Sequence, residues 1–217
     1  MKKLVATLAL FCVSFADSAV AMDSSSVMSQ DKWFVHVGGA WVNYVPAFNN
    51  FAGGPPGPRG LRIGDNFTGV IEAGRYVTPN IAFAVAAGIP PTANVDLTVG
   101  GAFAGNIGKV TFGSVMLLGQ YHFNSLGAIK PYIGAGAAYN ITLSTTPGPV
   151  AAGRLDVANG FGAVLQAGVE ADVANNVGVF LDVKKMFAST DVTIAPAVVS
   201  NVRFNPWIVS AGVSFRF

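Results

Sequence analysis

The chain is too apolar for an ordinary soluble domain, yet all of its apolar stretches are short. Of its 217 residues, 52% are hydrophobic and 11% are charged, and the mean hydropathy is +0.50. Its 26 glycines and 12 prolines interrupt the chain, so that after residue 21 no apolar run reaches the about 18 residues of a membrane-spanning helix. A chain that spans lipid without helices must pair its backbone groups between strands and close the sheet on itself. These features predict a transmembrane β-barrel.

The first 21 residues have the features of a secretory signal peptide. Lys2 and Lys3 form a positive start, residues 4–16 are almost wholly apolar, and Ala19-Val20-Ala21 has the small residues that signal peptidase accepts. We expect residues 1–21 to be the signal peptide and residues 22–217 the barrel, with a retained membrane anchor as the alternative. The only cysteine, Cys12, lies in this segment, so the expected mature chain has no thiol for a disulfide, a metal or catalysis.

The rest of the chain alternates strand-like stretches with two kinds of connection. Eight strands are predicted, at residues 32–44, 66–77, 81–90, 109–123, 130–143, 159–173, 177–189 and 204–217. Short turns, at residues 78–80, 124–129 and 174–176, alternate with long connections, at residues 45–65, 91–108, 144–158 and 190–203. This alternation predicts an all-β fold, an eight-stranded antiparallel up-and-down transmembrane barrel in an outer membrane, with its long loops facing outside.

The last predicted strand has the clearest two-residue period. Its odd-numbered positions carry Trp207, Val209, Ala211, Val213, Phe215 and Phe217, whereas its even-numbered positions are smaller or more polar. Large apolar side chains on one face, with aromatic rings near the ends, are typical of a strand that faces lipid. We therefore predict an aromatic girdle of Trp33, Trp41, Trp207, Phe215 and Phe217. A soluble lipocalin-like barrel, the rival fold, would keep its apolar residues inside.

Charge and motifs exclude several classes of function. Without Lys2, Lys3 and Asp17, the 13 basic and 11 acidic residues become 11 and 10 in no basic run, so we expect no nucleic-acid partner. The two histidines have no ligand spacing for a metal, and no phosphate-binding or dinucleotide-binding loop is complete, so we expect no metal and no cofactor. No Gly-x-Ser-x-Gly motif occurs, and we expect no enzyme.

The polar residues of the predicted strands define the face that points into the barrel. Placing them inward gives a polar belt of His36, Glu72, Gln120, Gln166, Glu170, Asp182 and Lys184. Because charges in a barrel interior need partners, we expect Lys184 to pair with Glu170, Asp182 or Glu72. An interior of eight strands is only just wide enough for side chains. We therefore expect the belt to close one end of the barrel rather than to form an aqueous pore or a catalytic site.

Above the belt the inward positions become apolar or small, unlike the polar lining of a porin. They are Val70, Ala84, Ala86, Gly88, Phe112, Met116, Leu118, Val164 and Met186. This face predicts an apolar pocket that is open to the outside and blocked below, which a small hydrophobic ligand or a detergent molecule would fill. Such a ligand would have to leave sideways into the membrane lipid. Pro90 and Pro91, which cannot donate to a strand ladder, are the predicted lateral opening, although they could simply end a strand.

Several motifs resemble the OmpW family of eight-stranded outer-membrane proteins. They are Gly119-Gln120-Tyr121-His122-Phe123, Lys130-Pro131-Tyr132-Ile133-Gly134-Ala135-Gly136-Ala137-Ala138-Tyr139, Gly160-Phe161-Gly162, Gln166-Ala167-Gly168-Val169-Glu170, and Asn205-Pro206-Trp207 running into Gly212-Val213-Ser214-Phe215-Arg216-Phe217. The family often has Leu-Pro-Pro at the start of its fourth strand, where this chain has Phe112-Gly113-Ser114. A C-terminal phenylalanine, here Phe217, is typical of proteins that the outer-membrane assembly machinery receives.

The resemblance implies a channel or binding barrel that admits small hydrophobic molecules, with lateral release into the membrane as our hypothesis. The alternative is a structural or surface-interaction protein whose outer loops bind a partner while the barrel anchors them. A lipid-modifying enzyme would need a serine and a histidine together near the outer rim; Ser144 and Ser189 lie there, but both histidines lie low in the barrel.

Overall fold

The computed structural model describes residues 33–49, 59–151, 153–194 and 198–217, and the expected signal peptide lies outside these residues. In this part of the chain, one antiparallel sheet contains thirteen strands. Eight strands form the barrel: β1 (Trp33–Asn43), β4 (Asn66–Tyr76), β5 (Ile81–Gly88), β7 (Ala102–His122), β8 (Ile129–Pro147), β10 (Gly160–Ala174), β11 (Val177–Ile194) and β13 (Trp207–Arg216). Five shorter strands extend it: β2 (Pro46–Asn49), β3 (Arg59–Ile63), β6 (Thr92–Val99), β9 (Leu155–Val157) and β12 (Val198–Phe204). Two short 3₁₀ helices are η1 (Asn124–Leu126) and η2 (Pro149–Ala151).

The eight long strands close into a barrel in simple up-and-down order. Each barrel strand pairs with the next along the chain, and β1 pairs with β13 to complete the circle. The first and last described residues of the sheet are joined by two hydrogen bonds, from Trp33 N to Phe217 O at 2.9 Å and from Phe217 N to Trp33 O at 3.0 Å. The predicted eight-stranded antiparallel barrel is confirmed, and within the described residues each barrel strand pairs with a neighbour on both sides.

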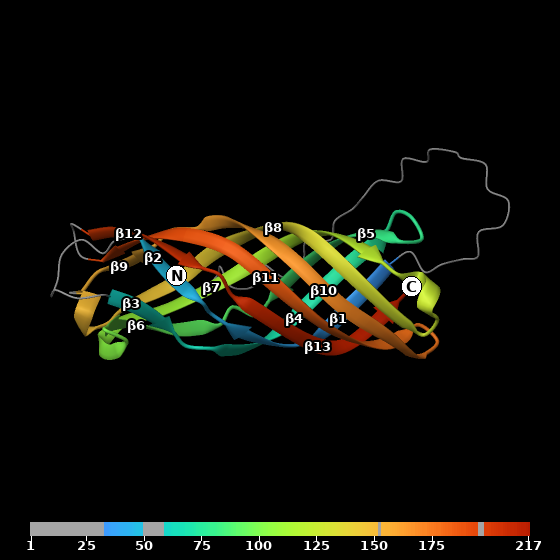
Figure 1. Ribbon diagram of the computed structural model, residues 1–217, viewed down its shortest axis with the longest axis horizontal. Helices are drawn as coiled ribbons and strands as arrows, with labels where there is room; N and C mark the ends of the chain where they lie inside the picture. Colours follow the sequence, from blue (N-terminus) through green and yellow to red (C-terminus); the bar gives the residue numbers. More distant parts are fainter. Residues whose placement is uncertain (1–32, 50–58, 152, 195–197) are drawn as a thin grey trace, which may run out of the picture. The chain divides into compact units, whose positions relative to one another are not determined.

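The two ends of the barrel differ. At the turn end, where Trp33 and Phe217 lie, short connections join β4 to β5, β7 to β8 and β10 to β11. The last of these turns places Asn176 at φ 62°, a conformation that asparagine tolerates better than most residues. At the loop end the chain continues into the five shorter strands, and Figure 1 shows them gathered opposite the C-terminus.

The four long connections contain strands that were not assigned from the sequence. Here β6 pairs with both β3 and the first half of β7, β12 pairs with β11 and β2, and β9 pairs with β11. The hairpin between β6 and β7 turns on Gly100 and Gly101, whose φ angles are 59° and 84°. A Gly-Gly pair is the sequence signal of a two-residue hairpin turn, so this extension of the barrel was detectable in the sequence.

The outer surface of the barrel is apolar. All eight barrel strands expose large hydrophobic side chains, among them Phe67, Phe83, Leu117, Ile133 and Leu165. No helix in the described ranges is long and apolar enough to cross a bilayer.

The predicted girdle residues lie in two groups on this surface. Trp33, Phe215 and Phe217 lie at the turn end, and the Arg75 guanidinium lies 5.4 Å from the centre of the Trp33 ring. Trp41 and Trp207 lie nearer the loop end. Eight residues of tilted strand separate Trp33 from Trp41, which is roughly 20 Å along the barrel axis and close to the height of an outer-membrane apolar band. The two groups are therefore placed to mark its two interfaces.

Candidate functional site: two apolar cavities above a polar belt

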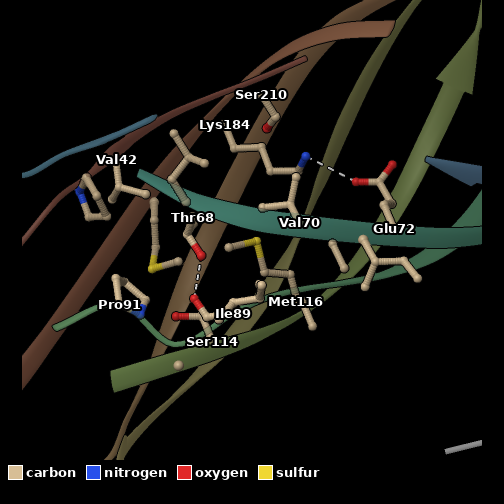
Figure 2. Close-up of a pocket in the computed structure, with 18 of the residues that line it drawn as sticks. Val42, Thr68, Val70, Glu72, Ile89, Pro91, Ser114, Met116, Lys184 and Ser210 are labelled. Atoms are coloured by element: carbon tan, nitrogen blue, oxygen red, sulfur yellow. Dashed lines mark hydrogen bonds and ion pairs between the residues drawn. The ribbon is translucent and has the colours of Figure 1, made fainter. Parts of the chain in front are cut away.

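The polar belt is built around one lysine. Lys184 Nζ lies 2.5 Å from Asp182 Oδ2 and 3.1 Å from Glu72 Oε2, and all three side chains are buried. Lys184 and Asp182 point inward from β11, and Glu72 points inward from β4 across the lumen. Figure 2 shows the ammonium group directed at the Glu72 carboxylate beside the cavity. A buried ion pair of this kind is stable only when further hydrogen bonds satisfy its remaining atoms.

Two glutamines supply those hydrogen bonds. Gln120 Nε2 donates to Glu72 Oε1 at 2.7 Å and to Gln166 Oε1 at 2.9 Å. Gln166 Nε2 in turn donates to Asp182 Oδ2 at 2.8 Å and to Glu72 Oε2 at 3.2 Å. Ser210, which the sequence analysis did not single out, donates to Asp182 Oδ1 at 2.8 Å. These contacts connect five of the barrel strands, β4, β7, β10, β11 and β13, through the interior.

His36 and Glu170 complete the belt on the side facing the turn end. The two ring nitrogens of His36 lie 3.6 Å from Glu72 and 3.6 Å from Glu170. Glu170 also forms an ion pair with Arg216 at 2.7 Å and accepts a hydrogen bond from Ser214. Of the three partners expected for Lys184, Asp182 and Glu72 contact it, whereas Glu170 pairs with Arg216 instead.

A layer of aromatic side chains lies below the belt, toward the turn end. This aromatic layer consists of Phe34, Tyr76, His122 and Tyr132, whose neighbouring rings are 5.0–5.6 Å apart. Tyr132 also donates to Asp182 at 3.2 Å, which ties the layer to the belt. The layer was missed in the sequence because a single strand gives no sign of which glycine lies opposite a large ring. Phe34 occupies the space beside Gly74, where an added Cβ would lie 2.3 Å from the ring.

An apolar cavity lies directly above the belt. We call it the inner cavity. His36, Glu72, Asp182 and Lys184 form its floor. Of the predicted pocket residues, six line it: Val70, Ala86, Gly88, Phe112, Met116 and Met186. Figure 2 shows Val70 and Met116 beside Lys184 and Glu72, so the apolar wall begins directly at the charged floor.

Three predicted pocket residues do not line the inner cavity. Ala84, Leu118 and Val164 are buried, but they belong to the packed core of the barrel. Ala84 and Leu118 are direct cross-strand neighbours, and Val164 lies opposite Met186. All three belong to the same cluster of buried apolar residues, and none of them borders the open space. Inward direction alone could not distinguish packed positions from open ones.

A second apolar cavity lies toward the loop end. We call it the outer cavity. Residues of the strands that extend the barrel build much of its wall, including Leu61 and Ile63 at β3, Ala93 and Val95 on β6, and Leu155 on β9. This cavity was not predicted from the sequence, because its wall is built from segments that were expected to be loops.

Four residues line both cavities, and we call them the border residues: Tyr44, Phe112, Asn140 and Phe204. The Tyr44 and Phe112 rings meet edge to face at 5.6 Å, and the Phe112 and Phe204 rings lie 6.4 Å apart. Only Phe112 was predicted. The border is therefore an aromatic neck between an outer and an inner apolar space.

The lining of the inner cavity includes residues of the barrel wall that face outward. Successive residues of a strand point to opposite faces of a sheet, yet residues 70, 71 and 72 of β4 all line the cavity, as do residues 86, 87 and 88 of β5. Ile71 faces outward and is 51% exposed, whereas Glu72 is buried inside. Residues of the wall that face outward therefore contribute to the lining of the cavity, beside the point where the ladder between β5 and β7 ends. We call this stretch of the wall the mouth.

The mouth lies where β7 changes partners. The ladder between β5 and β7 ends at Ala87 and Val115, and the ladder between β6 and β7 begins at Thr92 and Thr111. Between them, residues 112–114 of β7 face the segment 89–91, which we call the proline linker. Two of its three residues have no backbone N–H to donate, so the strand ladder cannot continue there.

Few hydrogen bonds hold the proline linker to its neighbours. Ile89 N donates to Gly69 O at 2.8 Å, Thr68 Oγ1 donates to Ile89 O, and Phe112 N donates to Pro91 O at 3.3 Å. Figure 2 shows the contact between Thr68 and Ile89 at the side of the cavity. Of the two predicted prolines, Pro91 lines the cavity, whereas Pro90 lies against β7 at Gly113.

The family of the chain is shown by its relatives. A profile of the OmpW family matches residues 54–217. The uncharacterized outer-membrane protein y4mB of Sinorhizobium fredii is 32% identical over 161 residues, which are 72% of this chain and 69% of the relative. The outer membrane protein AlkL of Ectopseudomonas oleovorans is 28% identical over 171 residues, covering 77% and 74%. The dibenzothiophene metabolism operon protein PahQ of Pseudomonas aeruginosa is 24% identical over 213 residues, covering 96% and 95%.

Two solved structures share the fold. The crystal structure of the outer membrane protein OprG from Pseudomonas aeruginosa superposes with a TM-score of 0.73 at 14% identity, covering 87% of this chain and 97% of OprG. The solid-state NMR structure of AlkL in DMPC lipid bilayers superposes with a TM-score of 0.66 at 24% identity, covering 91% of this chain and 95% of AlkL. With its barrel, its apolar outer surface and these relatives, the chain belongs to the OmpW family and is a bacterial outer-membrane β-barrel protein.

Proposed function

We propose that this barrel admits small hydrophobic molecules at its loop end and releases them sideways, through the mouth, into the hydrocarbon of the outer membrane. The observation that carries the proposal is the inner cavity, whose lining includes adjacent inward and outward residues of β4 and β5. A solute in this cavity has an apolar path to the lipid that crosses no water. The proline linker provides the path because it interrupts the ladder on which the wall depends.

The floor of the inner cavity supports release to the side rather than release below. The polar belt and the aromatic layer are buried from one wall of the lumen to the other. A hydrophobic solute that moved on toward the turn end would have to displace ion pairs and hydrogen bonds, leaving buried charges without partners at a cost of several kcal/mol. Leaving through the mouth requires only contact with Ile71, Ile89 and other apolar side chains.

The relatives support the class of solute. PahQ is named for an operon of dibenzothiophene metabolism, and dibenzothiophene is a small, flat, apolar molecule. Both cavities of this chain are lined mainly by apolar side chains. We further propose that the chain reaches the membrane through the outer-membrane assembly machinery, which would recognise the exposed C-terminal Phe217.

The test of the proposed function is solute uptake by whole cells. We expect a double-membraned bacterium that carries this protein to take up an apolar dye, one that fluoresces only in hydrocarbon, several-fold faster than the same cells without it. A hydrophilic solute of similar size is the control, and its uptake is expected to stay at the background rate because the belt fills the lumen. Equal dye uptake with and without the protein would remove the proposal.

A further inference from the structure

Two polar groups at the border between the cavities form no hydrogen bond within the part of the chain that the structure describes. Tyr44 is 6% exposed and Asn140 is 5% exposed, and both residues line both cavities. Among the described residues, the Tyr44 hydroxyl and the Asn140 Nδ2 amide group form no hydrogen bond. The amide oxygen of Asn140 is already used, since it accepts a hydrogen bond from Ser114. The groups left over are an O–H and an N–H₂, which are both hydrogen-bond donors.

These two groups differ from the other buried polar atoms that form no hydrogen bond. Those atoms belong to His36, Glu170 and Arg216, and each lies in the polar belt or beside it with an opposite charge nearby. Tyr44 and Asn140 instead line the two mainly apolar cavities, and the only charge that acts on the Tyr44 hydroxyl among the described residues is the Asp65 carboxylate, which can accept but not donate. A buried polar group without a partner destabilises the fold, and a phenylalanine and a leucine would fill the same volume without that cost. Their presence at the border is explained if a ligand supplies the missing acceptor.

The surroundings indicate which acceptor fits. None of the residues that line the outer cavity is charged, and at the floor of the inner cavity Lys184 is already paired with two carboxylates. A carboxylate at the border would be a buried charge without a countercharge, which is strongly unfavourable. A neutral oxygen, such as that of a ketone, an ester or an alcohol, can accept from both donors at no such cost.

We propose that Tyr44 and Asn140 form a recognition site for hydrophobic molecules that carry one neutral acceptor oxygen, and that the barrel binds these in preference to the plain hydrocarbon. The apolar body of the ligand lies in the two cavities, and its oxygen lies at the aromatic neck between them. This inference rests on the proposed function, because it names the class of solute that would use the same route. Phe112 and Phe204 hold the chain of the ligand at the neck while the two donors hold its oxygen.

The test compares a long-chain methyl ketone with the alkane of the same number of heavy atoms. Binding of each labelled ligand is measured at equilibrium with the protein in lipid nanodiscs and corrected with empty nanodiscs. We expect the protein to bind the ketone roughly tenfold more tightly than the alkane, the ratio for two neutral hydrogen bonds of ordinary net strength. Tyr44→Phe and Asn140→Leu are each expected to weaken ketone binding by roughly threefold, and the double variant to bind both ligands equally.

Thr190→Val is the matched control. Thr190 also lines the outer cavity, but its hydroxyl already donates to Ala158 O and is not available to a ligand. Replacing this hydroxyl is therefore expected to leave the ratio of ketone affinity to alkane affinity unchanged. Heat-modifiable migration on a denaturing gel shows that each variant is folded. Equal binding of ketone and alkane by the unaltered protein would overturn the inference, as would a ketone preference that persists in the double variant. Failure of the proposed function is separate, because it appears as unchanged dye uptake by cells.

Discussion

A disulfide across the mouth is expected to stop the uptake of an apolar dye. A Cβ placed on Gly113 lies 3.8 Å from the Cβ of Pro90, which is about the mean separation in a disulfide. The Pro90→Cys, Gly113→Cys variant would therefore join the proline linker to β7 without moving either backbone. Because the only natural cysteine, Cys12, lies in the expected signal peptide, no other thiol competes. When the pair is oxidised, we expect dye uptake to fall to the rate of cells that lack the protein.

The same variant provides its own control, since adding a reductant is expected to restore uptake. Thr92→Cys, Thr111→Cys is the matched second control. Thr111 lies two residues before Gly113 on β7 and is the ladder partner of Thr92 on β6. Their hydroxyl oxygens are 2.7 Å apart, so this disulfide would join strands that are already paired. Oxidation of this pair is expected to leave dye uptake unchanged. Full uptake through the oxidised Pro90–Gly113 variant, with the disulfide shown by mass spectrometry, would mean that solutes leave by another route.

Replacement of the belt lysine is expected to have the largest effect on stability. Lys184→Met leaves the buried carboxylates of Glu72 and Asp182 without their shared cation. Removing one partner from a buried ion pair costs about 3–5 kcal/mol, so we expect a loss of this size in the free energy of unfolding. Urea unfolding in lipid vesicles measures it through the fluorescence of the outward-facing tryptophans.

Two further variants separate charge from packing. Lys109→Met removes an exposed lysine of β7 and is expected to change the free energy of unfolding by less than about 0.5 kcal/mol. Adding Glu72→Gln and Asp182→Asn to Lys184→Met makes the centre of the belt neutral and is expected to recover most of the lost stability, because no uncompensated charge stays buried. If Lys184→Met is as stable as Lys109→Met, the belt does not hold the barrel together in the way that its contacts indicate.

Much of the barrel could be predicted because lipid imposes simple rules on strands. The last strand shows this most clearly: Trp207, Phe215 and Phe217 face outward, and Ser210 and Ser214 are buried, as the two-residue period predicts. The loop end was harder, since its strands face other protein segments and show no clean alternation. Only the Gly-Gly turn at residues 100 and 101 marked a hairpin there.

The polar belt of the site could be predicted from the sequence, whereas the position of the open space could not. Polar residues inside an apolar barrel stand out, which is why the members of the polar belt could be named from the sequence. Open space does not stand out, because it depends on which side chains meet across the lumen. Leu118 and Met116 lie on the same inward face of β7, yet Leu118 is packed and Met116 lines the inner cavity. Tyr44 and Asn140 were missed because single polar residues near loops are ordinary.

The prolines of this chain explain where its strand ladder is interrupted. Pro90 and Pro91 lie across the mouth from Phe112-Gly113-Ser114 of β7, on the segment between β5 and β6. Each proline lacks the backbone N–H that a continuous ladder would need at this level.

The path of the solute can be mapped directly with an alkane that carries a photoreactive diazirine. Cells that carry the protein are irradiated with this probe, and the labelled residues are identified by mass spectrometry, with excess unlabelled alkane as the competitor. We predict saturable labelling of Tyr44 at the border, of Met116 in the inner cavity and of Ile89 at the mouth. Saturable labelling of Lys130, Asp172 or Arg216, which line a polar pocket at the turn end, would show that solutes pass the belt and would contradict lateral release.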